Sequence, residues 1–138
     1  MPQKRALLWA GLLIYAASFA LFAFAGGGGR PIRGYGAAYL ALLIPLSENP
    51  FSAQSLFHDQ IFDYVALLIS GWINPLFLIT VTLVVLRRCQ RAVAIMRITV
   101  LLMIPFCWVV FHFEHFYPRE GHFLWLVGMV LTLFSSVE

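Results

Sequence analysis

The chain has 138 residues, of which 62% are hydrophobic and 11% charged, and its net charge is +3. A soluble domain carries about twice that charged fraction, so the composition excludes an ordinary soluble domain and predicts an integral membrane protein. The basic residues are few and mostly flank apolar runs, where they set membrane topology, so the positive charge is no sign of nucleic-acid binding.

Residues 6–25 form the first apolar run, which follows Lys4 and Arg5 and carries no charge. A run of this length is enough to cross a bilayer of about 30 Å as a helix. A cleaved signal peptide is the alternative, because residues 23–25 (AFA) before Gly26 resemble a small-x-small cleavage site. The run exceeds the usual apolar region of a signal peptide, about 7–15 residues, which favours a retained span.

The connection over residues 26–63 is expected on the outer face of the membrane, with one or two short helices. It begins with four glycines, residues 26–29, which cannot hold a helix. Residues 35–46 are apolar but too short to span, which leaves an interfacial helix or a re-entrant segment. Asn49 followed by Pro50 is typical of a helix start.

Residues 64–86 and 92–111 predict the second and third spans, joined by a basic turn over residues 87–91. The second span contains Asn74, a polar amide at membrane depth that needs a hydrogen-bond partner on another helix. The third contains Arg97 within its first two turns, close enough to the interface for its side chain to snorkel back.

Residues 123–137 predict the fourth span, and the stretch FHFEHFYPREGH before it predicts a short turn at the outer face. Its histidines His112 and His115 would share one helix face if the third helix continued through them, a spacing that suits two ligands of one metal ion. His58, Asp59, Asp63 or His122 would then supply a third ligand. The alternative is that these histidines are polar members of an aromatic belt at the membrane interface.

An even number of spans places both termini and the basic turn on one side of the membrane. More basic residues lie on that side than on the other, which predicts both termini in the cytoplasm and a bacterial inner-membrane location. Cys89 and Cys107 would lie about 27 Å apart on one helix, too far for a disulfide. Exposed residues of the outer face form a candidate partner-binding set: Arg30, Arg33, Glu114 and Arg119.

The predicted fold is a single all-α membrane domain over residues 1–138, a bundle of four transmembrane helices with an outer connection. The chain contains no phosphate loop, dinucleotide fingerprint or HExxH motif, and Ser18 and Ser70 have no histidine at their depth. This pattern favours a non-enzymatic binding or accessory subunit with a protein partner or a second copy of itself, for example an immunity protein against a membrane-acting toxin.

Two alternatives stay open. One is a membrane metalloprotein or enzyme that holds a transition metal on the outer face, and its candidate ligands are His58, Asp59, His112, His115 and His122. The other is an oligomeric channel or carrier with Asn74 and Arg97 near the pathway.

Overall fold

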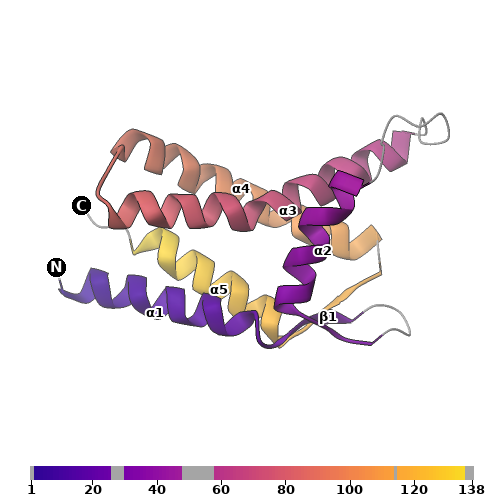
Figure 1. Cartoon of the computed structure of the whole chain (residues 1–138), viewed down its shortest axis with the longest axis horizontal. Coiled ribbons are helices and arrows are strands. Elements are labelled where there is room, and N and C mark those ends of the chain that lie inside the picture. The colour runs from indigo at the N-terminus through magenta and orange to yellow at the C-terminus, as the bar shows by residue number, and fades with distance from the viewer. Residues whose placement is uncertain (1, 26–29, 48–57, 114, 136–138) are drawn as a thin grey trace.

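The computed structural model describes residues 2–25, 30–47, 58–113 and 115–135. These residues form five α-helices and three short strands (Figure 1). In chain order the elements are α1 (Pro2–Ser18), β1 (Phe22–Ala25), β2 (Ile32–Arg33), α2 (Gly34–Ser47), α3 (His58–Val85), α4 (Gln90–Phe113), β3 (Tyr117–Pro118) and α5 (Glu120–Phe134). The chain is therefore mostly helical, as expected, with one small sheet in addition.

The long helices form two antiparallel pairs, α1 with α5 and α3 with α4 (Figure 1). In the first pair, a Cβ atom added to Gly128 would lie 2.5 Å from the backbone nitrogen of Tyr15. A Cβ atom added to Gly11 would lie 2.5 Å from Oγ1 of Thr132. The two glycines thus let the backbones of α1 and α5 approach closely, the packing that small residues permit between membrane helices.

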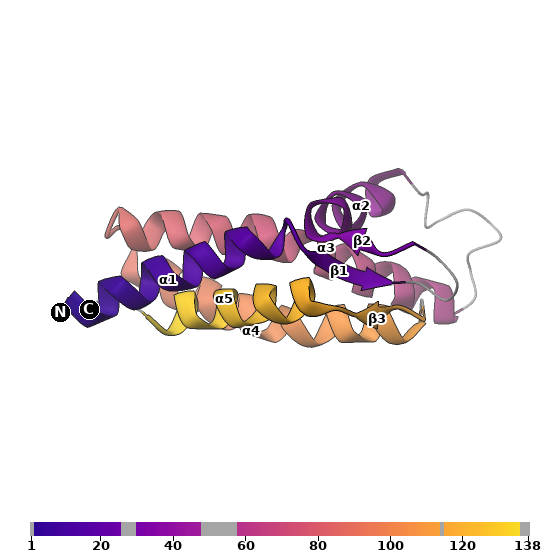
Figure 2. The ribbon, with the colours of Figure 1, turned by 90° about the horizontal axis from the view of Figure 1, so that it is seen from below.

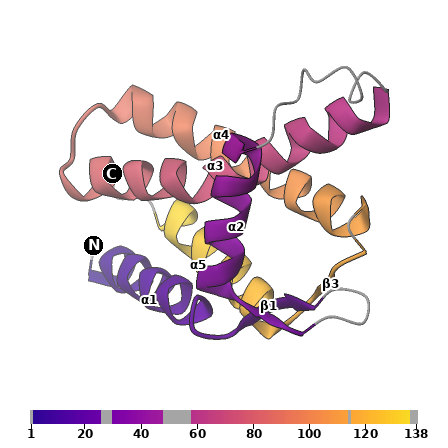
Figure 3. The same cartoon turned by 45° about the vertical axis from the view of Figure 1, so that its right-hand side comes forward.

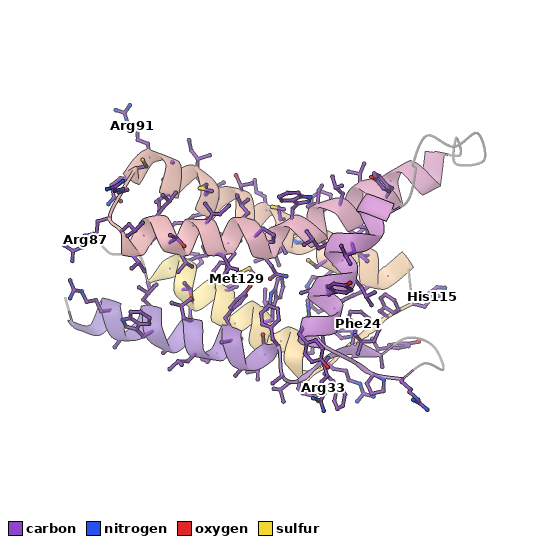
Figure 4. All side chains as sticks on the ribbon, in the orientation of Figure 1. Phe24, Arg33, Arg87, Arg91, His115 and Met129 are labelled. Atoms are coloured by element: carbon purple, nitrogen blue, oxygen red, sulfur yellow. The ribbon has the colours of Figure 1, made fainter. Side chains whose placement is uncertain are left out.

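One apolar core joins the two pairs. Its most deeply buried members are Ile73 and Phe77 of α3, Val100 of α4 and Met129 of α5 (Figure 4), and Tyr15 joins them from α1. The side chains of all three remaining long helices therefore pack against α3, which carries the middle of the core.

The molecule has two distinct ends. The start of α1, the turn between α3 and α4 and the end of α5 lie together at one end, with Arg87 and Arg91 (Figures 1 and 4). The sheet lies at the opposite end, where Figure 4 places Arg33 and His115. Figure 2 shows β1 and β3 beyond α1 and α5 on that side. The start and the end of the described chain therefore lie at the same end of the bundle (Figure 1).

Two helices are long and apolar enough to cross a membrane, by length and composition. They are Tyr64–Val85 with 22 residues and Gln90–His112 with 23 residues. In the most apolar 18-residue stretch of these two helices, only 33% and 22% of the stretch is buried inside the protein. The core helix of a soluble protein would be mostly buried. Helices α1 and α5 are apolar but shorter, so the length test supports two of the four expected spans.

The structure corrects the end of the first expected span. A continuous helix was expected over residues 6–25, but α1 ends at Ser18 and residues 22–25 form β1. The sheet order is β2-β1-β3, and both neighbours are antiparallel to β1. The ring of Phe24 stacks on Phe116 with centroids 4.5 Å apart and contacts Phe111 at 5.6 Å. Strand pairing and ring stacking with distant parts of the chain therefore hold this segment extended.

The remaining boundaries differ by a few residues from those expected. Helix α3 begins at His58, so the expected second span continues a helix that starts in the outer connection. Helix α4 runs two residues beyond the expected third span, and α5 begins at Glu120. The expected short helix of the connection is α2, which crosses the bundle between the sheet and α3 (Figure 3).

Candidate binding cavity

A cavity of about 150 Å³ lies where α1 ends and α5 begins. Its wall takes residues from every helix and from β1 and β2, and most of these residues are apolar. The side chains in the wall that carry polar or titratable groups are Ser18, Ser70, Asn74, Cys107, His122 and Trp125. A chamber that is mostly apolar with a few polar groups is the usual form of a small-molecule site.

Helix α2 closes the cavity with small side chains. Ala37, Ala38 and Ala41 line the wall from this helix. A Cβ atom added to Gly71 of α3 would overlap the carbonyl oxygen of Ala41, so the backbone of α2 rests directly on α3 at this point. Helix α2 also contributes Gly34 and Leu40 to the wall, but the short side chains of its three alanines leave space between this helix and the bundle.

Asn74 joins three helices at the cavity wall. Its Oδ1 accepts a hydrogen bond from the hydroxyl of Tyr15 on α1 at 2.9 Å and another from Nε1 of Trp125 on α5 at 2.8 Å. The indole nitrogen can only donate, so the atom facing it must be the amide oxygen and not the amide nitrogen. The expectation that Asn74 needs a partner on another helix is therefore confirmed, with two partners.

In this orientation the amide nitrogen of Asn74 keeps its hydrogen-bond donors unused. Both hydrogen bonds of the Asn74 side chain end on Oδ1, and in the described part of the chain its Nδ2 donates none. An amide nitrogen carries two N–H donors. Since Asn74 lines the cavity, these donors are available to a ligand there.

His122 is the second polar group with unused hydrogen-bonding capacity. The residue is only 5% exposed and lies in the first turn of α5. Its ring stacks on Trp125 with centroids 5.3 Å apart and meets Phe111 edge-on at 4.6 Å. Its Nε2 is buried and has no hydrogen-bond partner among the residues that the structure describes. A buried polar atom without a partner costs free energy. With less than 1 Å² of accessible surface, this nitrogen is closed to a molecule in the cavity.

The two serines of the wall are already engaged. The hydroxyl of Ser18 donates to the carbonyl oxygen of Tyr15 at 2.6 Å, and that of Ser70 donates to the carbonyl oxygen of Leu67 at 2.8 Å. Both bonds stay within the serine's own helix. The unused polar groups of the cavity are thus concentrated on Asn74 and His122, and Trp125 connects the two.

The structure does not bring the predicted metal ligands together within its described residues. His112 lies in the last turn of α4 and is exposed. His115 follows the end of that helix with φ of 53° and is exposed as well, so the two histidines do not continue one helix face. His122 is buried among aromatic rings on another element. No group of three His, Cys, Asp or Glu side chains that could hold a metal ion occurs in the described residues.

Part of the predicted metal site lies outside the description. The backbones of His58, Asp59 and Asp63 belong to the first two turns of α3, but their side chains are outside the described residues. Glu114, which was predicted to bind a partner, lies outside the described residues entirely. A metal site that includes these side chains therefore stays a prediction.

The arginines predicted to bind a partner are exposed. Arg30, Arg33 and Arg119 all lie in the segments around the sheet. The guanidinium of Arg33 lies over the ring of Phe22 at 5.9 Å from its centroid, which holds this side chain against the sheet. A protein partner at this end stays a prediction.

Arg97, the second predicted intramembrane polar residue, lies in α4 and is partly buried. Its Nε has no hydrogen-bond partner in the described part of the chain. It is absent from the cavity wall, so the two predicted intramembrane polar residues, Asn74 and Arg97, do not share this site.

The sequence analysis missed Trp125 and the alanines of α2 as site residues. Trp125 follows His122 by three positions, so the two side chains share one face of α5, and that spacing was a usable signal. The alanines gave no comparable signal, because only the crossing of α2 over α3 makes them part of a wall.

Comparison of the chain with protein-family models, with curated proteins and with solved structures finds no match. The function must therefore be argued from the site itself.

Proposed function

We propose that this chain is a small polytopic membrane protein of four spans that acts by binding, and that its ligand is a small, mostly apolar molecule held in the cavity. The observation that carries this proposal is the mostly apolar cavity itself, whose wall includes the Asn74 amide with an Nδ2 that donates no hydrogen bond among the described residues. A mostly apolar pocket with a few hydrogen-bonding groups is the usual form of a ligand site.

The surface of the bundle supports a lipid environment. Large apolar side chains are exposed on α1, α4 and α5, for example Leu13 at 71%, Leu102 at 66% and Phe134 at 69%. Water does not favour so many exposed apolar side chains on three helices, whereas lipid tails do. Together with the length of α3 and α4, this exposure supports an integral membrane protein.

The pairing of α1 with α5 supports four spans. Helix α1 has 17 residues and α5 has 15, or about 26 Å and 22 Å, less than a hydrocarbon layer of about 30 Å. The four residues of β1 add about 13 Å beyond the end of α1. As the central strand, β1 has a partner strand on each side, so other parts of the protein supply hydrogen bonds to this extended segment.

The chemistry of the wall supports binding over catalysis. Both serine hydroxyls donate to carbonyl oxygens of their own helices, so neither is paired with His122 as a nucleophile with its base. Among the described residues, Nε2 of His122 has no hydrogen-bond partner, so no carboxylate orients the ring through this nitrogen. What remains is a shaped apolar space with hydrogen-bonding groups, which selects a ligand.

The proposal is tested with 4-fluorotoluene as a probe of the cavity, observed by ¹⁹F NMR with the protein in lipid nanodiscs. We expect one saturable site per chain, above the partitioning seen in empty nanodiscs. The variant Ala38→Leu fills the cavity and should abolish the saturable component. The matched control Ala94→Leu adds the same side chain at an exposed position of α4 and should leave it unchanged. Equal signals from both variants would refute the cavity as the binding site.

A further inference from the structure

The side-chain amide of Asn74 has a nitrogen that a molecule can reach, unlike the buried nitrogen of His122. Among the described residues, the buried side-chain nitrogen and oxygen atoms without a partner are Nε of Arg97 and Nε2 of His122. Nδ2 of Asn74 is not one of them, although it donates no hydrogen bond in the described part of the chain. This nitrogen therefore keeps accessible surface.

That surface lies on the inner side of α3. Ser70 and Phe77 share the helix face of Asn74, and they are only 8% and 0% exposed. Oδ1 of the same amide faces the bundle as well, because it accepts hydrogen bonds from Tyr15 of α1 and Trp125 of α5. Since Asn74 lines the cavity, the cavity is the space onto which Nδ2 opens.

The size and walls of the cavity suit a guest of about one ring. An apolar cavity of about 150 Å³ in a protein interior accommodates benzene, and this cavity has about that volume. The rings of Phe24, Phe111 and Phe116 contribute to its wall. Aromatic walls favour an aromatic guest, since offset-stacked and edge-on ring contacts add to the effect of apolar burial.

The Asn74 amide determines which polar group suits this guest. Nδ2 carries two N–H donors, so the matching group is a hydrogen-bond acceptor. A carbonyl oxygen accepts and brings no hydrogen of its own, whereas a hydroxyl brings a hydrogen while Oδ1 already accepts two bonds. A carboxylate would need a compensating positive charge, and among the described residues no lysine or arginine contributes to the wall. An uncharged carbonyl is therefore the best match.

We propose that the ligand of this cavity is a small uncharged aromatic molecule with a carbonyl oxygen, bound with its ring among the phenylalanine side chains and its oxygen at Nδ2 of Asn74. This inference rests on the proposed function, because it names the ligand class of the same cavity. It extends that function by making Asn74, which also ties three helices together, the residue that determines specificity.

The first measurement compares 4-fluoroacetophenone with 1-fluoro-4-isopropylbenzene by ¹⁹F NMR in nanodiscs, because the isopropyl group has nearly the shape of the acetyl group but no acceptor. The preference is the ratio of the two dissociation constants, corrected for partitioning into empty nanodiscs. We expect the wild-type protein to prefer the ketone about fivefold or more, the effect of one hydrogen bond, and Asn74→Leu to lose this preference. The matched control Thr80→Val removes a buried hydroxyl from the same helix outside the cavity wall and should keep it.

The second measurement observes the Asn74 amide directly in the wild-type protein, so the test does not depend on the folding of Asn74→Leu. The chain has two asparagines, Asn49 and Asn74. Labelling with ¹⁵N-asparagine therefore gives two side-chain amide signals, which the variant Asn49→Gln assigns. We expect the ketone to shift the amide protons of Asn74 saturably to lower field, and the hydrocarbon to shift them little.

The outcomes separate this inference from the proposed function. Continued binding of the hydrocarbon by Asn74→Leu shows that the cavity of the variant is intact. Equal corrected affinities of the wild-type protein for both probes, or an Asn74 signal that responds alike to both, overturn the inference and leave the proposed function standing. A wild-type protein that binds neither probe above the level of Ala38→Leu also overturns the inference, and 4-fluorotoluene then decides the proposed function on its own.

Discussion

Oδ1 of Asn74 in α3 and Nε1 of Trp125 in α5 form a hydrogen bond of 2.8 Å, and the hydroxyl of Tyr15 in α1 donates to the same oxygen at 2.9 Å. This single acceptor ties the middle of α3 to positions near the end of α1 and the start of α5. Toward the sheet end of the molecule, α3 and α4 lie beside the sheet and α2 and no longer beside α1 and α5. The cavity lies at this junction between the two arrangements, so Asn74 positions both the helices and the site.

Asn74→Leu should destabilise the protein by about 1–3 kcal/mol. Leucine keeps the branching at Cγ, although it is larger, and leaves the Tyr15 hydroxyl and the Trp125 N–H without their acceptor. Reversible unfolding in mixed micelles measures the effect. The control is Thr99→Val, which removes an exposed hydroxyl that bonds within α4 and should change stability by no more than about 0.5 kcal/mol. Equal losses in the two variants would show that the interhelical bonds of Asn74 contribute nothing measurable.

Gly128→Ala should also destabilise the protein, although alanine is the better helix former by about 1 kcal/mol. The added Cβ would lie 2.5 Å from the backbone nitrogen of Tyr15, so α1 and α5 must separate, at a net cost of about 1–3 kcal/mol. The control is Gly36→Ala in α2, where the new Cβ would meet the Cγ2 methyl of Ile32 at 3.2 Å and no backbone atom. That variant should be neutral or slightly more stable. A stabilised Gly128→Ala would contradict the close packing of this pair.

The two ends of the molecule should be reachable from opposite sides of the membrane. Cys89 is exposed in the basic turn, whereas Cys107 is buried and serves as an internal control. Tyr117 belongs to β3 and is 66% exposed, so Tyr117→Cys marks the other end. A membrane-impermeant maleimide added to intact cells should label Tyr117→Cys and leave Cys89 unlabelled until the cells are permeabilised, because basic residues concentrate at the Cys89 end. Labelling of both positions from one side would exclude four spans.

Much of the helical framework followed from the sequence because it depends on local patterns. Apolar runs of sufficient length located α3 and α4, and a polar amide in such a run implied the interhelical bonds of Asn74. The sheet could not be predicted in this way. Residues 22–25 are as apolar as a helix end in lipid, and only their pairing with β2 and β3 makes them a strand.

The site was harder to predict than the helices, because it depends on where two helices stop. His122 was grouped with His112 and His115 by its position in the sequence, as a polar residue of an outer turn. In the fold it begins α5 and packs on Trp125 and Phe111, while His115 is exposed. Proximity along the chain therefore grouped residues that have different surroundings, and in the fold His122 shares the cavity wall with Asn74 of another helix.

Phe24→Leu distinguishes the observed strand from the helix expected at this position. In a lipid-facing helix leucine replaces phenylalanine with little change in stability. In the structure Phe24 is 8% exposed and stacks on Phe116 at 4.5 Å, so the variant loses ring contacts worth about 0.5–1.5 kcal/mol in addition to apolar burial. We expect Phe24→Leu to lose about 1–2 kcal/mol of stability in total. Phe22→Leu should lose less than about 1 kcal/mol, because the Phe22 side chain is 38% exposed. Among the ring and cation contacts of the described residues, the Phe22 ring has only the guanidinium of Arg33. Reversible unfolding in mixed micelles compares the two variants, and a neutral Phe24→Leu would favour a helix that continues through residue 25.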